Sequence, residues 1–236
     1  MRRFRSALLA ASAAGLIAAG IAHAQPAPTY DPAQLPVTKG KIAGYSLTPR
    51  GDVDGVFLDN GTEVHFPPHL GTQIVFTARP GDAVTIHGLQ ARSLPLVQGV
   101  SLTNDATNQT VTDTGPPGGP GPRGPGRGEL LEAQGRIKMQ LHGPRGDLNG
   151  VLLEDGTMIH LPPPEAQRLA AQLAPGQTIF ASGEGVDSPL GKSIAARAIG
   201  PTQAQAVQIA APPPPPPGGP RHPPGGPGVA PPPPPG

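Results

Sequence analysis

The sequence is 236 residues long and holds 34 Gly, 36 Pro and no Cys, with 17 Lys and Arg against 16 Asp and Glu. Glycine and proline make up 12 of the 16 residues in Asp113–Gly128 and 21 of the 26 in Ala211–Gly236, a density that excludes a packed core there. The rest of the chain suffices for two domains of roughly 65 to 75 residues, which excludes one large enzyme core, and the lack of Cys excludes disulfides and thiolate chemistry.

Residues 1–24 have the pattern of a secretory signal peptide. Three arginines are followed by an apolar stretch over residues 7–21, and Ala22-His23-Ala24 presents small residues where a signal peptidase cleaves. The stretch is shorter than the roughly 20 residues of a membrane-spanning helix. We therefore expect cleavage, a periplasmic or secreted protein with no transmembrane segment in its mature chain, and an N-terminal linker over residues 25–38.

Cleavage changes the charge of the protein. The leader removes three Arg and no acid, which leaves 14 basic against 16 acidic residues, a net charge of −2. Nucleic-acid binding depends on clustered Lys and Arg that displace counterions from phosphates. This balance argues against a nucleic-acid partner.

An internal repeat organises the rest of the chain. Pro49–Pro68 and Pro144–Pro163 are identical at 12 of 20 positions without a gap, at an offset of 95 residues, and the same offset relates Gly40-Lys41-Ile42 to Gly135-Arg136-Ile137. The chain is therefore divided into a first domain over 39–112, a Gly/Pro-rich linker over 113–130, a second domain over 131–203 and a Pro-rich disordered tail over 204–236. The Gly-rich linker predicts that the two domains move independently.

In chain order, the first unit contains three strands, a short helix and two further strands. Its second and third strands are joined by Asn60-Gly61, a strong two-residue hairpin signal. The fourth and fifth strands are predicted over 83–87 and 97–102. The helix is weak because β-branched residues interrupt it; its apolar face is formed by Leu70, Ile74 and Ala78.

The second unit repeats this order with clearer signals. Asp155-Gly156 forms the hairpin turn, and the three prolines 162–164 end the third strand before an apolar pattern with the helical period begins at Glu165. Pro175-Gly176 ends the helix. The predicted strands cover 135–141, 150–154, 157–161, 178–182 and 193–199.

Five strands with a helix between the third and fourth is the order of the OB-fold. Each unit resembles exported bacterial proteins with OB-fold-like domains, through the Gly-x-Ile opening, the Asn-Gly or Asp-Gly hairpin and the Pro-Gly before the fourth strand. The resemblance implies an all-β fold with one short helix per unit, in two tandem five-stranded barrels. It supplies no site residues.

The best candidate site lies on the outward faces of the second and third strands, which OB-folds commonly use for ligands. Alternation along the third strand predicts that Glu63 and His65 point away from the barrel, as do Met158 and His160 in the second unit. A ligand patch centred on the two histidines is one interpretation, and half-exposed sheet residues that pair with neighbours are the other.

Two further candidate sites are weaker. Met139, His142, Met158 and His160 are soft and imidazole ligands of the type that bind copper, but the first unit keeps only one of the four, so we assign no metal ion and no cofactor. Arg50 and Arg145, each in a Pro-Arg-Gly-Asp turn, are suited to clamp an anionic ligand or to pair with a neighbouring Asp.

The sequence thus predicts a non-catalytic, exported binding protein with tandem OB-like barrels. No nucleophile elbow or similar catalytic context occurs in it. An oligosaccharide or envelope polymer is the favoured ligand. The alternatives are a cell-envelope scaffold protein, in which the Pro-rich tail and the barrels hold protein partners, and a periplasmic metal-binding protein.

Overall fold

The computed structural model describes residues 31–115 and 128–209. The predicted signal peptide lies outside the described residues, as do most of the predicted linker and tail. No helix within the described ranges is long and apolar enough to cross a membrane.

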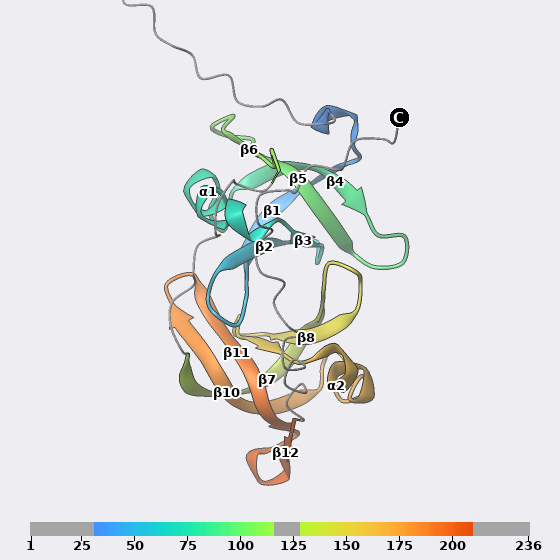
Figure 1. Ribbon diagram of the computed structural model, residues 1–236, viewed down its shortest axis with the longest axis vertical. Helices are drawn as coiled ribbons and strands as arrows, with labels where there is room; N and C mark the ends of the chain where they lie inside the picture. Colours follow the sequence, from blue (N-terminus) through green and yellow to red (C-terminus); the bar gives the residue numbers. More distant parts are fainter. Residues whose placement is uncertain (1–30, 116–127, 210–236) are drawn as a thin grey trace, which may run out of the picture.

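The first repeat unit forms a closed five-stranded barrel (barrel 1; Figure 1). Its strands run in the order β3-β2-β1-β4-β5, and a parallel pairing between β5 and β3 closes the cylinder. The elements are η1 Pro32–Gln34, β1 Val37–Leu47, β2 Val53–Leu58, β3 Glu63–His65, η2 Pro68–Leu70, α1 Gly71–Thr77, β4 Ala83–Gln90, β5 Leu96–Asn104 and the short edge strand β6 Thr110–Thr112.

The second unit forms a barrel of the same topology (barrel 2). Its strands run β10-β7-β8-β9-β11, with β9 parallel to β11 and β10 antiparallel to β11. The elements are β7 Glu129–His142, β8 Leu148–Leu153, β9 Met158–His160, α2 Pro163–Arg168, β10 Thr178–Ser188, β11 Gly191–Gly200, η3 Gln203–Gln205 and β12 Val207–Gln208. The prediction of two tandem OB-like barrels, each with one short helix between its third and fourth strands, is confirmed.

The hairpin turns follow directly from the sequence. Gly61 and Gly156 have φ of 83° and 87°, a left-handed conformation that glycine adopts without steric cost. The residue before each glycine caps the turn, because the Asn60 and Asp155 side chains accept the backbone N–H groups of Thr62 and Thr157. Both barrels therefore place their second and third strands in the same register.

Several elements differ in length from the sequence prediction. Helix α2 ends at Arg168, whereas the apolar pattern predicted a helix to Leu173; Leu169 and Leu173 are still buried, in turns that follow the helix. Strand β12 lies inside the predicted tail, because Val207 pairs with Ile199 of β11 and thereby extends the sheet. Strands β1 and β7 begin two residues before the predicted starts of the two domains, at 39 and 131.

The two barrels pack against each other, so the prediction of independently moving domains is wrong. Each barrel has its own apolar filling, but the buried cluster of barrel 1 continues into Leu141, Leu152 and Met158 of barrel 2. Figure 1 shows the barrels stacked along the long axis of the molecule, and hydrogen bonds join β1 and β3 of barrel 1 to β9 and β7 of barrel 2. The outward faces of these strands are apolar enough that their burial stabilises the contact.

Candidate functional site

The contact between the barrels joins equivalent positions of the two repeat units. The His142 N–H donates to Glu63 Oε2 at 3.0 Å, and the Leu47 N–H donates to Met158 Sδ at 3.3 Å. The offset of 95 residues relates the two donors, Leu47 and His142. It also relates the two acceptors, Glu63 and Met158. The contact is therefore isologous, as in a two-fold symmetric dimer, although it lies within one chain.

The turns that follow the first strands extend this symmetry. Gly51 of barrel 1 packs against Val186 of β10, and its equivalent Gly146 of barrel 2 packs against Leu94 between β4 and β5. Gln98 Nε2 also donates to the Pro144 carbonyl at 3.0 Å. Each turn thus contacts the fourth-to-fifth-strand hairpin of the other barrel.

In one half of the contact, a buried carboxylate lies between two histidines. Glu63 and His65 are 2% and 7% exposed. His65 Nε2 lies 3.1 Å from Glu63 Oε1 and 2.8 Å from the His142 carbonyl oxygen, and His142 Nδ1 lies 3.6 Å from Glu63 Oε2. Since both neighbours of His65 Nε2 are acceptors, this nitrogen carries a proton. We call Glu63, His65 and His142 the polar half of the contact.

These contacts determine the protonation of the polar half. Burial opposes the charge of Glu63, yet hydrogen bonds from His142 and His65 outweigh it and lower the pKa of the carboxyl. Burial likewise disfavours the His65 imidazolium, but the Glu63 carboxylate outweighs it and raises the pKa of His65. The two groups therefore stabilise each other in their charged forms.

The other half of the contact is built from Met158, His160 and Leu47, and we call it the apolar half. Met158 is 1% exposed, and it replaces the carboxylate with a thioether, a weak acceptor. His160 Nε2 is buried without a hydrogen-bond partner among the described residues. Burial lowers the pKa of His160, although the Asp54 carboxylate acts in the opposite direction, so this imidazole is kept neutral.

The predicted ligand patch therefore lies inside the molecule. Glu63, His65, Met158 and His160 point away from their own barrels, as alternation predicted, but the other barrel covers them. Sequence reasoning missed Leu47 as the partner of Met158, because an offset shows which residues are equivalent and not which residues touch. His142 was considered only as a copper ligand.

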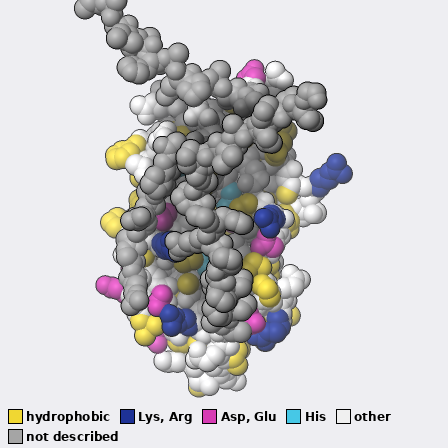
Figure 2. All heavy atoms as spheres, viewed as in Figure 1, with side chains coloured by type: hydrophobic (Ala, Val, Ile, Leu, Met, Phe, Trp, Pro, Cys, Tyr) yellow, Lys and Arg dark blue, Asp and Glu magenta, His cyan; other side chains and the backbone are white. Residues whose placement is uncertain are grey.

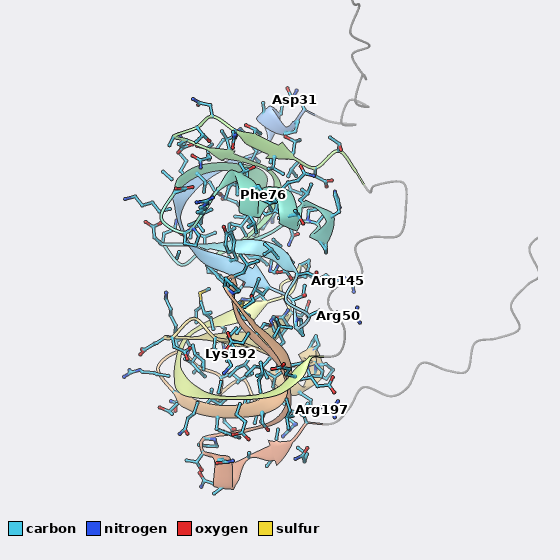
Figure 3. The ribbon with its side chains drawn as sticks, turned by 90° about the vertical axis from the view of Figure 1, so that its left-hand side faces the viewer. Asp31, Arg50, Phe76, Arg145, Lys192 and Arg197 are labelled. Carbon is cyan, nitrogen blue, oxygen red and sulfur yellow. The ribbon has the colours of Figure 1, made fainter. Side chains whose placement is uncertain are left out.

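The four copper candidates are divided: Met139 and Met158 lie in one apolar cluster, whereas His142 and His160 belong to opposite halves of the contact. Residues 31–115 and 128–209 contain no group of three or more His, Cys, Asp or Glu side chains placed to hold a metal ion. Arg50 and Arg145 are exposed, form no ion pair with another described residue, and extend from the same side of the molecule in Figure 3.

A cleft of about 460 Å³ opens between the barrels beside this contact. Its walls are again equivalent segments, with Gly44, Phe57 and Asp59 of barrel 1 opposite Met139, Leu152 and Glu154 of barrel 2. The tip of the β10–β11 hairpin, residues 188–192, also lines the cleft.

The chemistry of the cleft is mixed. Apolar side chains line it from both barrels: Tyr45, Phe57, Met139, Leu152, Met158 and Leu190. Charged groups of both signs also line it: Asp59, Glu154, Asp155, Lys138 and Lys192. Arg136 lies 3.6 Å from Glu154 and compensates part of its charge, and Lys192 Nζ donates to the backbone carbonyl of Glu132 at 2.8 Å. An apolar lining with a few polar groups is typical of sites that bind small molecules.

Comparison with known proteins adds little to this description. No family model matches the chain, and no curated protein matches it. Among solved structures, a deletion mutant of the single-stranded DNA-binding protein from Thermus aquaticus is similar at a TM-score of 0.23 and 12% identity, over 75% of this chain and 95% of that one. The wild-type form of that protein gives a TM-score of 0.22 and 12% identity, over 75% and 93% of the two chains. Likenesses at this level carry no argument about function.

Proposed function

We propose that this protein is an exported, non-catalytic binding protein that holds an uncharged oligosaccharide or similar envelope polymer in the cleft between its barrels. The observation that carries the proposal is the cleft itself, since equivalent residues of the two repeat units form its facing walls. A ligand there contacts two rigid sheets at once, so little conformational entropy is lost when it binds.

The lining supports this ligand class. Apolar side chains such as Phe57 and Leu190 suit the apolar face of a sugar ring, while carboxylates and ammonium groups accept from and donate to hydroxyls. A polyanion fits less well, because Asp59, Glu154 and Asp155 repel phosphates. Among the described residues left uncovered in Figure 2, Lys and Arg side chains are interspersed with Asp and Glu.

Export is supported by the leader pattern of residues 1–24. The absence of Cys from the sequence leaves no thiol to oxidise outside the cytoplasm. A periplasmic or secreted location also gives the protein access to envelope glycans.

The cleft can be tested with a substitution that fills it. A Cβ added at Gly44 meets no atom within 4 Å, so Gly44→Met should fold normally and project a side chain into the cleft opposite Met139. Soluble peptidoglycan strands, uncharged glucan oligosaccharides and single-stranded oligothymidylate are the probes, and calorimetry with the mature chain is the measurement. We expect binding of at least one glycan, at least tenfold weaker in Gly44→Met and unchanged in the exposed control Ala171→Met.

A scaffold role is the second candidate, favoured by exposed apolar side chains away from the cleft. Phe76 on α1 and Leu130 on β7 are 79% and 75% exposed, as expected for residues that contact a protein partner (Figure 3 labels Phe76). Failure of every glycan and of oligothymidylate to bind would overturn the cleft proposal and favour the scaffold.

A further inference from the structure

A carboxylate with almost no solvent exposure destabilises a contact unless its charge is compensated. Glu63 is 2% exposed and lies at the junction of the barrels. At the equivalent position of barrel 2, the uncharged Met158 is the hydrogen-bond acceptor. A buried charge is tolerated only where it is paired and hydrogen-bonded. The partners of Glu63 come from both barrels, His65 from its own and His142 from the other, so contact between the barrels adds to the stabilisation of its charge.

We propose that Glu63, His65 and His142 form a proton-operated latch, which holds the two barrels together more tightly in mildly acidic than in alkaline medium. The link across the contact is double. The His142 N–H donates to Glu63 Oε2, and the protonated His65 Nε2 is shared between Glu63 Oε1 and the His142 carbonyl. When His65 loses its positive charge, a charge-assisted pair becomes a weaker contact between an anion and a neutral donor.

The charged groups around the latch set the direction of its response. Asp54 faces it from β2, and like Glu63 it favours the His65 imidazolium, whereas His160 faces it from β9 and is kept neutral by burial. Since the pKa of His65 is raised above 6.5, its contribution is complete below that pH and is lost as the pH rises through the raised pKa. His160 acts in the opposite sense, because its lowered pKa destabilises the contact in acid.

The latch is connected to the cleft through Met158, which lines the cleft and accepts the Leu47 N–H across the contact. A looser contact therefore changes the width of the cleft. This consequence rests on the proposed binding function, whereas the latch does not.

Two backbone amides report on the latch without any ligand. His142 N–H donates to the Glu63 carboxylate, and its equivalent Leu47 N–H donates to the Met158 thioether. Amide hydrogen exchange of the mature chain by NMR, at about pH 5.5 and about pH 8.5 and corrected for intrinsic rates, measures how often each contact opens. We expect the protection of His142 to fall roughly tenfold relative to that of Leu47 at the higher pH, the size of change expected when an ionised donor becomes neutral.

Glu63→Gln provides the matched variant, because it keeps the shape of the side chain and removes the charge. In this variant the difference between the two amides should no longer depend on pH. Equal pH dependence of the His142 and Leu47 amides in the wild-type chain would overturn the latch, and that comparison needs no variant to fold. Neither result depends on whether a glycan binds, so the latch and the cleft can fail separately.

Discussion

The two halves of the barrel contact use the same scaffold for opposite chemistry. His65 and His160 occupy equivalent positions on β3 and β9, yet the pKa of His65 is raised and that of His160 is lowered. The residue two positions earlier accounts for the difference, since Glu63 is a carboxylate and Met158 is not. The residue across the contact matches it in each case, with His142 facing Glu63 and Leu47 facing Met158.

This comparison shows that a buried site is defined by a pair of positions and not by one. A carboxylate is compatible with the contact where a histidine and a backbone N–H neutralise it, and a thioether is compatible where the partner is apolar. Changing one member of a pair should therefore cost more than changing the two members together.

The largest effect is expected when the apolar half receives a charge. Met158→Glu places a carboxylate beside His160 but opposite Leu47, so it lacks the histidine that faces Glu63 from across the contact. The substitution should lower the free energy of unfolding by about 3–5 kcal/mol. Chemical denaturation of the mature chain measures this, with Met158→Leu as the volume-matched control that should cost less than about 1.5 kcal/mol. Equal stability of the two variants would show that the halves do not differ as described.

A smaller loss is expected when the polar half loses its charge. Glu63→Gln should lower the free energy of unfolding by about 1.5–3 kcal/mol, the range for hydrogen bonds to an ionised group. Moving the carboxylate to barrel 2, in the double variant Glu63→Gln with Met158→Glu, should not recover this loss. Position 158 faces Leu47, which cannot pair with a carboxylate through its side chain. A double-mutant cycle between Glu63→Gln and His65→Ala should give a clear coupling energy, because these two side chains lie 3.1 Å apart, and simple additivity would count against a direct interaction.

The pH dependence of stability should test the charge pair of the polar half. The lowered pKa of Glu63 gives stability that is present above its unfolded value of 4.5 and lost in stronger acid, and the raised pKa of His65 gives stability that is present below 6.5 and lost as the pH rises. The advantage of the wild-type chain over Glu63→Gln should therefore be greatest between these values and smaller in alkali. Denaturation curves across this range measure it, and an advantage that grows with pH would reverse the assignment.

The smallest effect is expected at the rim of the cleft, where the barrels are most alike. Asp59 and Glu154 are equivalent acidic residues, and the Glu154–Arg136 pair is about 60% exposed on both sides. Glu154→Gln should change stability by less than about 1 kcal/mol, as is usual for exposed ion pairs. The same substitution should weaken glycan binding if the carboxylate contacts the ligand, which calorimetry can measure beside Asp59→Asn.

Much of the fold could be predicted because it depends on local signals. The Asn60-Gly61 and Asp155-Gly156 turns, the alternation in the third strands and the prolines before α2 each act within a few residues, and the repeat allowed each signal to be read twice. The end of α2 was predicted less well, and strand β12 was not predicted, since its residues were assigned to the tail. The helix ends before its apolar pattern does, and Val207 gains a sheet partner that is distant in the sequence.

The sequence by itself determined that the chain contains two copies of one small barrel, and that Glu63, His65, Met158 and His160 point out of them. Only the tertiary structure decided that these outward faces cover each other, that Glu63 meets His142 while Met158 meets Leu47, and that a cleft opens beside them. The reason is physical. A strand's alternation is a local property of the backbone, whereas the packing of two closed barrels depends on the shape and chemistry of whole surfaces, assembled from residues about 80 to 110 positions apart.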